Sequence, residues 1–296
     1  MSIFKKPLSI RLKIAIIVLL NIATLIVVVY VVSNTILSKS YLQIEQDQTV
    51  LNIQRVNDAI EGIATELTVK LTDWAYWDDT YEFMVDQNED YRDSNLEDIA
   101  LFNLNVNSMV FVSPDNEIIF KKAIDLESVE EVSSEDIANH ILTNKKLTAH
   151  VDDSSFVEGI IMLPDGPEII SSRPVLSTER TGPIHGTLIF TKPINDKAIK
   201  ALSDLTHLSI QLYDFNSSSL PNDVVEAKTS LAKGEDEYFT NPLSDDSIAG
   251  YQILKDVYGS PALIMKIDRP RDVFSQGQVT LYLFVIIAGV MVTLFG

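Results

Sequence analysis

Two long apolar segments bracket the chain, and no comparable run lies between them. The first covers residues 14–32 and the second residues 279–295, and neither contains a charged side chain. At 1.5 Å per residue, a helix over the first segment reaches roughly 28 Å, close to the thickness of the hydrocarbon core of a bilayer. The pattern therefore predicts transmembrane helices at 14–32 and 279–296, with residues 33–278 together on one side of the membrane.

Apolar residues continue beyond the first span at helical spacing. They recur every three or four positions, at Ile53, Val56, Ile60, Ile63, Leu67, Leu71 and Trp74. Such a stripe marks one face of an amphipathic helix. We therefore expect the membrane helix to continue outward as a stalk, from about residue 33 to about residue 83. The upper part of the stripe should pack on the domain's own sheet, whereas the more polar lower part suits a dimer stalk.

The periodicity then changes to that of strands. Short apolar runs separated by turn residues such as Pro114-Asp115-Asn116-Glu117 predict strands and hairpins. The candidate strands are 108–113, 118–121, 156–163, 168–176, 186–192, 208–215, 248–255 and 262–268. Helices are predicted at 133–144, 196–206 and 269–278, the last leading into the second span. The order of elements indicates an α+β fold, with the long N-terminal helix packed on a mostly antiparallel sheet.

Charge orients the chain in the membrane. Lys5, Lys6, Arg11 and Lys13 precede the first span, and all 42 acidic residues follow it. Because positive residues flank the cytoplasmic end of a span, residues 1–13 should be cytoplasmic and residues 33–278 extracytoplasmic. The apolar core exceeds that of a signal peptide, so we expect an uncleaved anchor in a multi-pass protein of the inner (plasma) membrane. The chain stops within its second span, which indicates a fragment of a longer protein.

Composition excludes several classes of function. The formal net charge of −19 opposes binding to nucleic acid, and we interpret the acidic residues as a solvated surface. The absence of cysteine excludes disulfides and thiolate metal sites. The four histidines are scattered without a metal-binding spacing, and no nucleophile or phosphate-loop motif is present. We therefore expect no enzyme activity, no cofactor and no metal site within this chain.

The densest chemistry lies in one aromatic and acidic segment. Its candidate ligand-binding residues are Asp73, Trp74, Trp77, Asp78, Asp79 and Tyr81. On a continuous helix, Trp74, Trp77, Asp78 and Tyr81 would share one face. Two interpretations follow: the rings seal the helix against the sheet while the carboxylates cap backbone amides, or the rings and carboxylates line a ligand pocket. A metal ion held by Asp78 and Asp79 is disfavoured, because adjacent helical residues point about 100° apart.

The same segment carries a family resemblance. Asp73-Trp74-Ala75-x-Trp77-Asp78-Asp79-Thr80-Tyr81-x-Phe83, soon after a first span, resembles the signature of the CHASE4 family of extracytoplasmic sensor domains. Further agreement is seen at Phe111-Val112-Ser113, Ser172-x-Pro174-Val175-Leu176, Gly182-Pro183-x-x-Gly186-Thr187-Leu188, Asp256-x-Tyr258-Gly259-x-Pro261 and Pro270-Arg271. The resemblance covers about residues 41–275. Thr191-Lys192 stands where the family commonly has Gly-Arg, so a ligand role of that arginine does not transfer.

The resemblance implies a PAS-like or Cache-like sensor of a bacterial or archaeal receptor. Such domains usually precede a domain for cyclic-di-GMP synthesis or hydrolysis, or a histidine kinase, neither of which this chain contains. We expect a module that senses an unidentified small molecule and signals through its two membrane helices as a homodimer, with a cyclic-di-GMP output favoured. The alternatives are the sensor of a histidine kinase and a module that binds a periplasmic protein partner.

Overall fold

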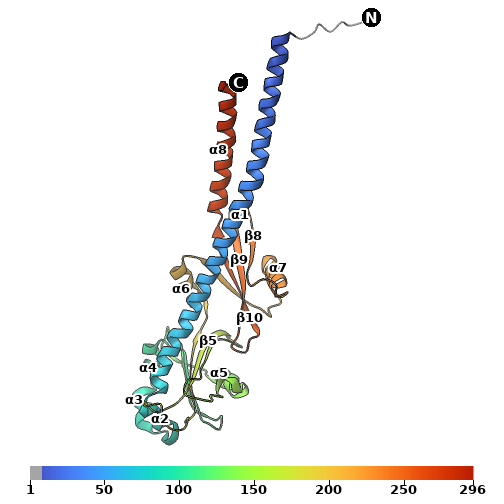
Figure 1. The fold of residues 1–296 in the computed structure, drawn as a ribbon. Coiled ribbons are helices and arrows are strands. Elements are labelled where there is room, and N and C mark those ends of the chain that lie inside the picture. The colour runs from blue at the N-terminus through green and yellow to red at the C-terminus, as the bar shows by residue number, and fades with distance from the viewer. Residues whose placement is uncertain (1–8, 296) are drawn as a thin grey trace. The chain divides into compact units, whose positions relative to one another are not determined.

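A single helix, α1 (Ile10–Ala75), contains the first apolar span and most of the predicted stalk. The structure, a computed structural model, describes residues 9–295 (Figure 1). Most of the expected cytoplasmic segment 1–13, and Gly296 of the second span, lie outside the described residues. At the other end of the chain, α8 (Asp272–Phe295) joins the predicted exit helix and the second span into one helix.

The prediction that the stalk helix continues to about residue 83 is wrong for its last two turns, because α1 ends at Ala75. Trp77 has an extended backbone, with φ −104° and ψ 132°, and α2 (Asp78–Asp86) begins after it. The carbonyl of Ala75 accepts a hydrogen bond from the backbone N–H of Leu176, which satisfies a terminal carbonyl of the helix. A contact about a hundred residues away in the sequence therefore helps to end the helix.

The chain divides into two units. The first contains the described residues up to Leu51, Thr240–Ala249 and the described residues from Asp268 onward, and the second contains Asn52–Phe239 and Gly250–Ile267. Strands form two sheets, where the sequence predicted one: a six-stranded sheet of order β3-β2-β1-β6-β5-β4 and a four-stranded sheet of order β7-β10-β9-β8. The neighbouring strands of the six-stranded sheet are all antiparallel, so the predicted α+β class with antiparallel strands is confirmed.

The predicted strands appear within a few residues of their expected positions. The strands are β1 (Ser108–Val112), β2 (Ile118–Ile124), β3 (Glu131–Val132), β4 (Val157–Leu163), β5 (Gly166–Pro174), β6 (Thr187–Pro193), β7 (Ser209–Asp214), β8 (Phe239–Pro242), β9 (Ser247–Lys255) and β10 (Pro261–Pro270). The remaining helices are α3 (Glu89–Asn95), α4 (Asp98–Leu104), α5 (Glu135–Thr143), the short 3₁₀ helix η1 (Lys145–Leu147), α6 (Asp196–Thr206) and α7 (Asn222–Leu231). The sequence patterns did not predict β3, β8, α3, α4 or α7.

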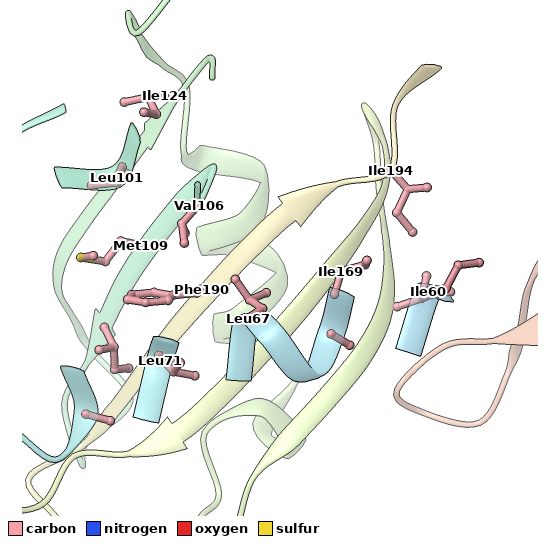
Figure 2. Close-up of a cluster of buried hydrophobic side chains, with 14 of the residues drawn as sticks. Ile60, Leu67, Leu71, Leu101, Val106, Met109, Ile124, Ile169, Phe190 and Ile194 are labelled. Carbon is pink, nitrogen blue, oxygen red and sulfur yellow. The ribbon is translucent and has the colours of Figure 1, made fainter. Parts of the chain in front are cut away.

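The apolar stripe of α1 covers one face of the six-stranded sheet. Ile60, Leu67 and Leu71 are buried in the same cluster as Ile169 of β5 and Phe190 of β6 (Figure 2). The opposite face carries a second buried cluster, formed by alternate strand residues and the apolar side of α5. Its buried members are Val110, Val112, Ile137, Ile141, Leu147, Ile161, Leu163, Ile170 and Ile189. Burial on both faces explains why these strands read as continuous apolar runs.

Two helices are long and apolar enough to cross a membrane. The candidate spans are Ile10–Val28 of α1 and Asp272–Met291 of α8. No side chain of the first window is buried, although the mean hydropathy of the window is high. The predicted spans therefore coincide with helices of suitable length and composition.

Candidate functional site

The break between α1 and α2 separates the six predicted site residues into groups. Because Trp77 leaves the helical conformation, the prediction that Trp74, Trp77, Asp78 and Tyr81 share one helix face is wrong. Trp74 belongs to the sheet side: its ring meets Phe190 edge-on at 6.3 Å and Trp77 at 6.1 Å. Asp73 is exposed and lies apart from the cleft described below.

Asp78 and Tyr81 hold the connection between β5 and β6. The Asp78 carboxylate accepts a hydrogen bond of 2.8 Å from the backbone N–H of Thr178. The Tyr81 ring stacks on His185 at 3.7 Å between centroids, and its hydroxyl donates to the Pro183 carbonyl at 3.4 Å. These contacts join the first turns of α2 to the connection between β5 and β6.

Trp77 and Asp79 instead line a surface cleft of about 450 Å³ beside α2 and α3. The other lining residues are Glu82, Asn88, Asp90, Tyr91, Ser94 and Asn95. The cleft thus combines one indole ring with three carboxylates and several neutral polar groups. An aromatic face next to negative charge favours a ligand that presents a cation or N–H donors. We call this surface the Trp77 cleft.

Tyr91 forms the buried base of the Trp77 cleft. Its ring stacks on Phe83 at 4.6 Å and lies 5.9 Å from that of Trp77. Its hydroxyl shares a hydrogen bond of 2.7 Å with the Thr80 hydroxyl. Burial raises the pKa of Tyr91 to about 12, so the phenol stays neutral at physiological pH. The base of the cleft is therefore uncharged, and its charged lining residues are Asp79, Glu82 and Asp90.

The residues that α3 contributes to the cleft were missed by the sequence analysis. One local signal does mark this helix: Asn88 is its N-cap, and its side chain accepts a hydrogen bond from the backbone N–H of Tyr91. Asparagine followed by acidic residues is a typical helix start. Within the described residues, no group of three or more acidic or histidine side chains is placed to hold a metal ion.

A family model and a curated relative both match this chain. The model of the CHASE4 domain matches residues 59–213, a range that includes the Trp77 cleft. The methanogenesis regulatory histidine kinase FilI of Methanothrix harundinacea is 23% identical over 248 residues, which cover 83% of this chain and 26% of the kinase. The chain therefore spans about a quarter of the length of this curated relative.

Two solved structures of other proteins show a partial likeness to this chain. The periplasmic domain of Vibrio cholerae LuxQ is 12% identical, with a TM-score of 0.49, over 75% of this chain and 99% of that chain. The periplasmic sensory domain of the Campylobacter jejuni chemoreceptor Tlp1 is 12% identical, with a TM-score of 0.38, over 77% of this chain and 93% of that chain. With its family model matched over residues 59–213, just over half of its length, this chain belongs to the CHASE4 family, and it resembles a region of the histidine kinase FilI.

Proposed function

We propose that this chain is the ligand-sensing input module of a membrane-anchored histidine kinase, with the Trp77 cleft as its ligand site. FilI, a histidine kinase, supports this class of output. The cyclic-di-GMP output that the sequence favoured receives no support from the comparisons. In this proposal both apolar helices cross the inner membrane, residues 33–278 are extracytoplasmic, and two copies act as a symmetric dimer.

One observation carries the proposal: the Trp77 cleft begins two residues after α1 ends at Ala75. Trp77 lines the cleft and is also the N-cap of α2, while α1 is a single helix from Ile10 to Ala75. A ligand that binds one backbone geometry at Trp77 more tightly than another shifts the population between them. In this mechanism the ligand changes how the end of α1 joins α2, and the helix passes that change to its own apolar span.

The ligand in this mechanism carries a cationic group. The Trp77 ring offers its negative face, and Asp79, Glu82 and Asp90 supply carboxylates at the rim. Such contacts are weak when fully solvated, so the buried Phe83–Tyr91 stack beneath them matters as a fixed support. The site therefore binds and reports, and its residues perform no covalent chemistry.

The test uses two matched substitutions that each remove one negative charge. The full chain in detergent micelles is screened for compounds that raise its melting temperature, since a ligand stabilises the folded state in proportion to occupancy. Asp79→Asn should weaken the apparent affinity for a true ligand about tenfold, so a higher ligand concentration is needed for the same rise in melting temperature. Asp73→Asn, outside the cleft, should leave the affinity unchanged. Equal effects of the two variants would refute the assignment of the cleft.

A protein partner is the second candidate, and α4 favours it. Ile99 and Phe102 lie three residues apart on this helix and remain 52% and 43% exposed. Apolar side chains on one exposed helix face are typical of contact surfaces. A photo-crosslinking amino acid at position 102 should then capture a defined envelope protein in intact cells, while the same group at exposed position 69 of α1 should not.

A further inference from the structure

A second cleft, distinct from the Trp77 cleft, lies beside α1 in the second unit. Its volume is about 680 Å³, within the range of small-molecule sites. It is formed by α1 residues 57–65, by β4 and β5, and by Glu237 and residues 252–255 of β9. The two clefts share no lining residue. We call this surface the Gln252 cleft.

The floor of the Gln252 cleft is apolar and its rim is acidic. Ile60, Ala64, Ile160, Ile169 and Leu254 are buried and form the apolar part. Three carboxylates also line the cleft, those of Glu61, Glu158 and Glu237, and Lys255 is the one cationic lining residue. The charge balance excludes an anion as the preferred occupant, and the floor provides room for a short aliphatic chain.

Gln252 supplies an independent indication of a ligand. Its side chain lines the cleft, it is only 8% exposed, and its Oε1 atom is buried without a hydrogen-bond partner. A buried acceptor left unpaired costs free energy, so such atoms normally meet a donor. A ligand N–H group would supply the missing donor, and the neighbouring carboxylates favour one that carries positive charge.

Hydrogen bonds from neighbouring side chains orient two of the carboxylates that line the cleft. Thr68 donates a hydrogen bond of 2.6 Å to Oε2 of Glu158, and the buried Ser171 hydroxyl lies 2.8 Å from that of Thr68. Because Thr68 has one hydroxyl hydrogen, Ser171 acts as the donor to Thr68. On α1, the Asn57 side-chain amide donates to Oε1 of Glu61 at 2.7 Å. Two of the three carboxylates are thus oriented before any ligand arrives.

We propose that the Gln252 cleft is a binding site for a small organic ammonium ion with a short apolar chain. The ammonium group donates to the Gln252 Oε1 atom and to the carboxylates of Glu61 and Glu158, and the chain lies on Ile160 and Leu254. An inorganic cation fits less well, because none of the described acidic residues group closely enough to hold a metal. The site does not depend on the proposed role of the Trp77 cleft.

Binding here would connect three parts of the sequence. Apart from Glu237, the lining residues come from α1, from the β4–β5 hairpin and from β9, which lie far apart along the chain. An occupant that contacts all three stabilises their arrangement relative to one another. The amine therefore acts on the part of α1 between residues 57 and 65, which is a different region from the end of α1 at Trp77.

The experiment is a calorimetric titration of the full chain in detergent micelles with 1,4-diaminobutane, at 150 mM salt to screen general attraction to the acidic protein. Butylamine tests a single ammonium group, and succinate is the anionic control. We expect saturable binding of both amines and none of succinate. Glu61→Gln and Glu158→Gln should each weaken amine binding about tenfold, whereas Asp58→Asn, an exposed α1 residue outside the cleft, should leave it unchanged.

Gln252→Met separates binding from folding, because it keeps the side-chain volume and removes the unpaired oxygen. It should weaken amine binding without lowering the melting temperature of the free chain. Absence of amine binding at millimolar concentration, or equal weakening by Asp58→Asn and Glu61→Gln, would overturn the proposal. Loss of amine binding in Asp79→Asn would also overturn it, because that result places the amine in the Trp77 cleft.

Discussion

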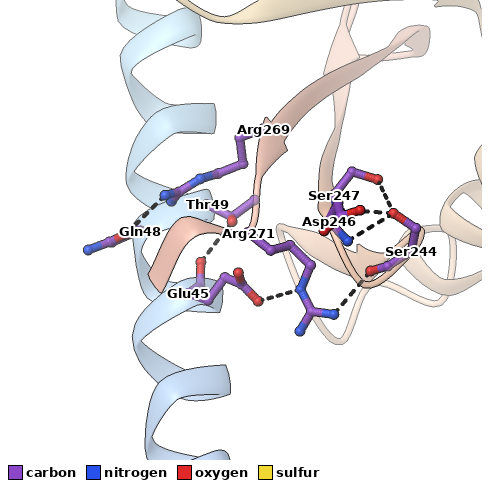
Figure 3. A network of polar contacts seen from close by, with 8 residues as sticks. All are labelled: Glu45, Gln48, Thr49, Ser244, Asp246, Ser247, Arg269 and Arg271. Carbon is purple, nitrogen blue, oxygen red and sulfur yellow. Dashed lines mark hydrogen bonds and ion pairs between the residues drawn. The ribbon is translucent and has the colours of Figure 1, made fainter. Parts of the chain in front are cut away.

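Helix α1 is held by two different kinds of contact in its two halves. In the second unit, the residues from Ile53 to Leu71 pack an apolar stripe on the six-stranded sheet (Figure 2). In the first unit, Glu45 of α1 is fully buried and receives a hydrogen bond of 2.9 Å from the guanidinium of Arg271, the residue that precedes α8 (Figure 3). One half is therefore held by apolar packing and the other by a buried ion pair.

The polar contact is part of a larger network. Arg271 also donates to the Ser244 carbonyl through its guanidinium and to the Asp246 carbonyl through its backbone N–H. Arg269 donates to the Gln48 side chain at 3.1 Å, one turn further along α1 (Figure 3). These contacts tie α1 to the strand that leads into α8, and both helices contain the candidate membrane spans.

The difference matters because the two kinds of contact tolerate change differently. Apolar packing is non-directional, so a stripe can shift while remaining buried. A buried ion pair stabilises little in net terms, but losing one partner leaves a charge without water or counter-ion. The apolar half is therefore suited to stability, and the polar half to fixing the relative position of α1 and the start of α8.

The largest expected effect is on the apolar half. Phe190 is fully buried on β6 and meets Trp74 edge-on. Phe190→Ala should destabilise the chain by about 3–5 kcal/mol, because it removes a large buried ring and leaves a cavity. The loss is measured by denaturant unfolding of the chain in micelles, with exposed Val69→Ala as control. A loss below about 1 kcal/mol would contradict the assignment of Phe190 to the core.

The ion pair should show a different signature. Arg271→Met leaves Glu45 buried without its cation and should cost about 3 kcal/mol. The double variant Glu45→Met with Arg271→Met removes both charges and should recover most of that loss. The comparison uses unfolding free energies of both single variants and the double variant. If the loss of unfolding free energy in the double variant equals the sum of the losses in the two single variants, Glu45 and Arg271 are not coupled, which would contradict the ion pair in the structure.

His150 tests how a largely buried titratable group behaves in the second unit. Burial, and secondly the Arg173 charge, lower its pKa to about 4 from 6.5. Since Ser172 donates its only hydroxyl hydrogen to the Leu147 carbonyl, the His150 Nε2–H donates to Ser172. The neutral ring thus stabilises the fold above pH 6.5, and this contribution is lost as the pH falls toward 4.

The wild-type chain should accordingly lose on the order of 1–2 kcal/mol between pH 7 and pH 5 through this histidine. His150→Gln should flatten that part of the stability profile, measured by unfolding at intervals of half a pH unit. His207→Gln provides the control. An unchanged slope in His150→Gln would show that the ring is not protected from protonation by its surroundings.

The smallest effect concerns Glu168 on β5. Burial raises the pKa of its carboxyl, only partly offset by the Thr191 hydroxyl, while nearby Asp165 raises it further. Below pH 4.5 the Glu168 carboxyl is protonated, and its burial does not destabilise the fold. As the pH rises through the folded-state pKa, the carboxyl must ionise while buried, and the fold loses stability. Glu168→Gln should therefore raise stability at neutral pH by about 1 kcal/mol or less and have little effect at pH 4. A destabilised variant at pH 7 would indicate that the carboxylate has a partner that it needs.

Several features of the fold could be predicted from the sequence alone. The stripe from Ile53 to Leu71 and the strand runs were predictable, because helix and strand periodicities follow from backbone geometry alone. The CHASE4 signature around Trp77 was equally visible, and the family match confirms it. The charge and hydropathy of the two ends were also sufficient to locate both apolar helices.

The tertiary structure decided what those residues do. A hydrogen bond from Leu176 helps to end α1 at Ala75, so Trp77 lines a cleft with Tyr91 while Asp78 holds Thr178. Glu45 and Arg271, far apart in the sequence, become an ion pair, and Gln252 lines the second cleft together with Glu61 and Glu158. Periodicity records which face of an element is apolar. It carries no information on which distant residue satisfies a buried charge or a terminal carbonyl, because that partner is selected only when the elements pack together.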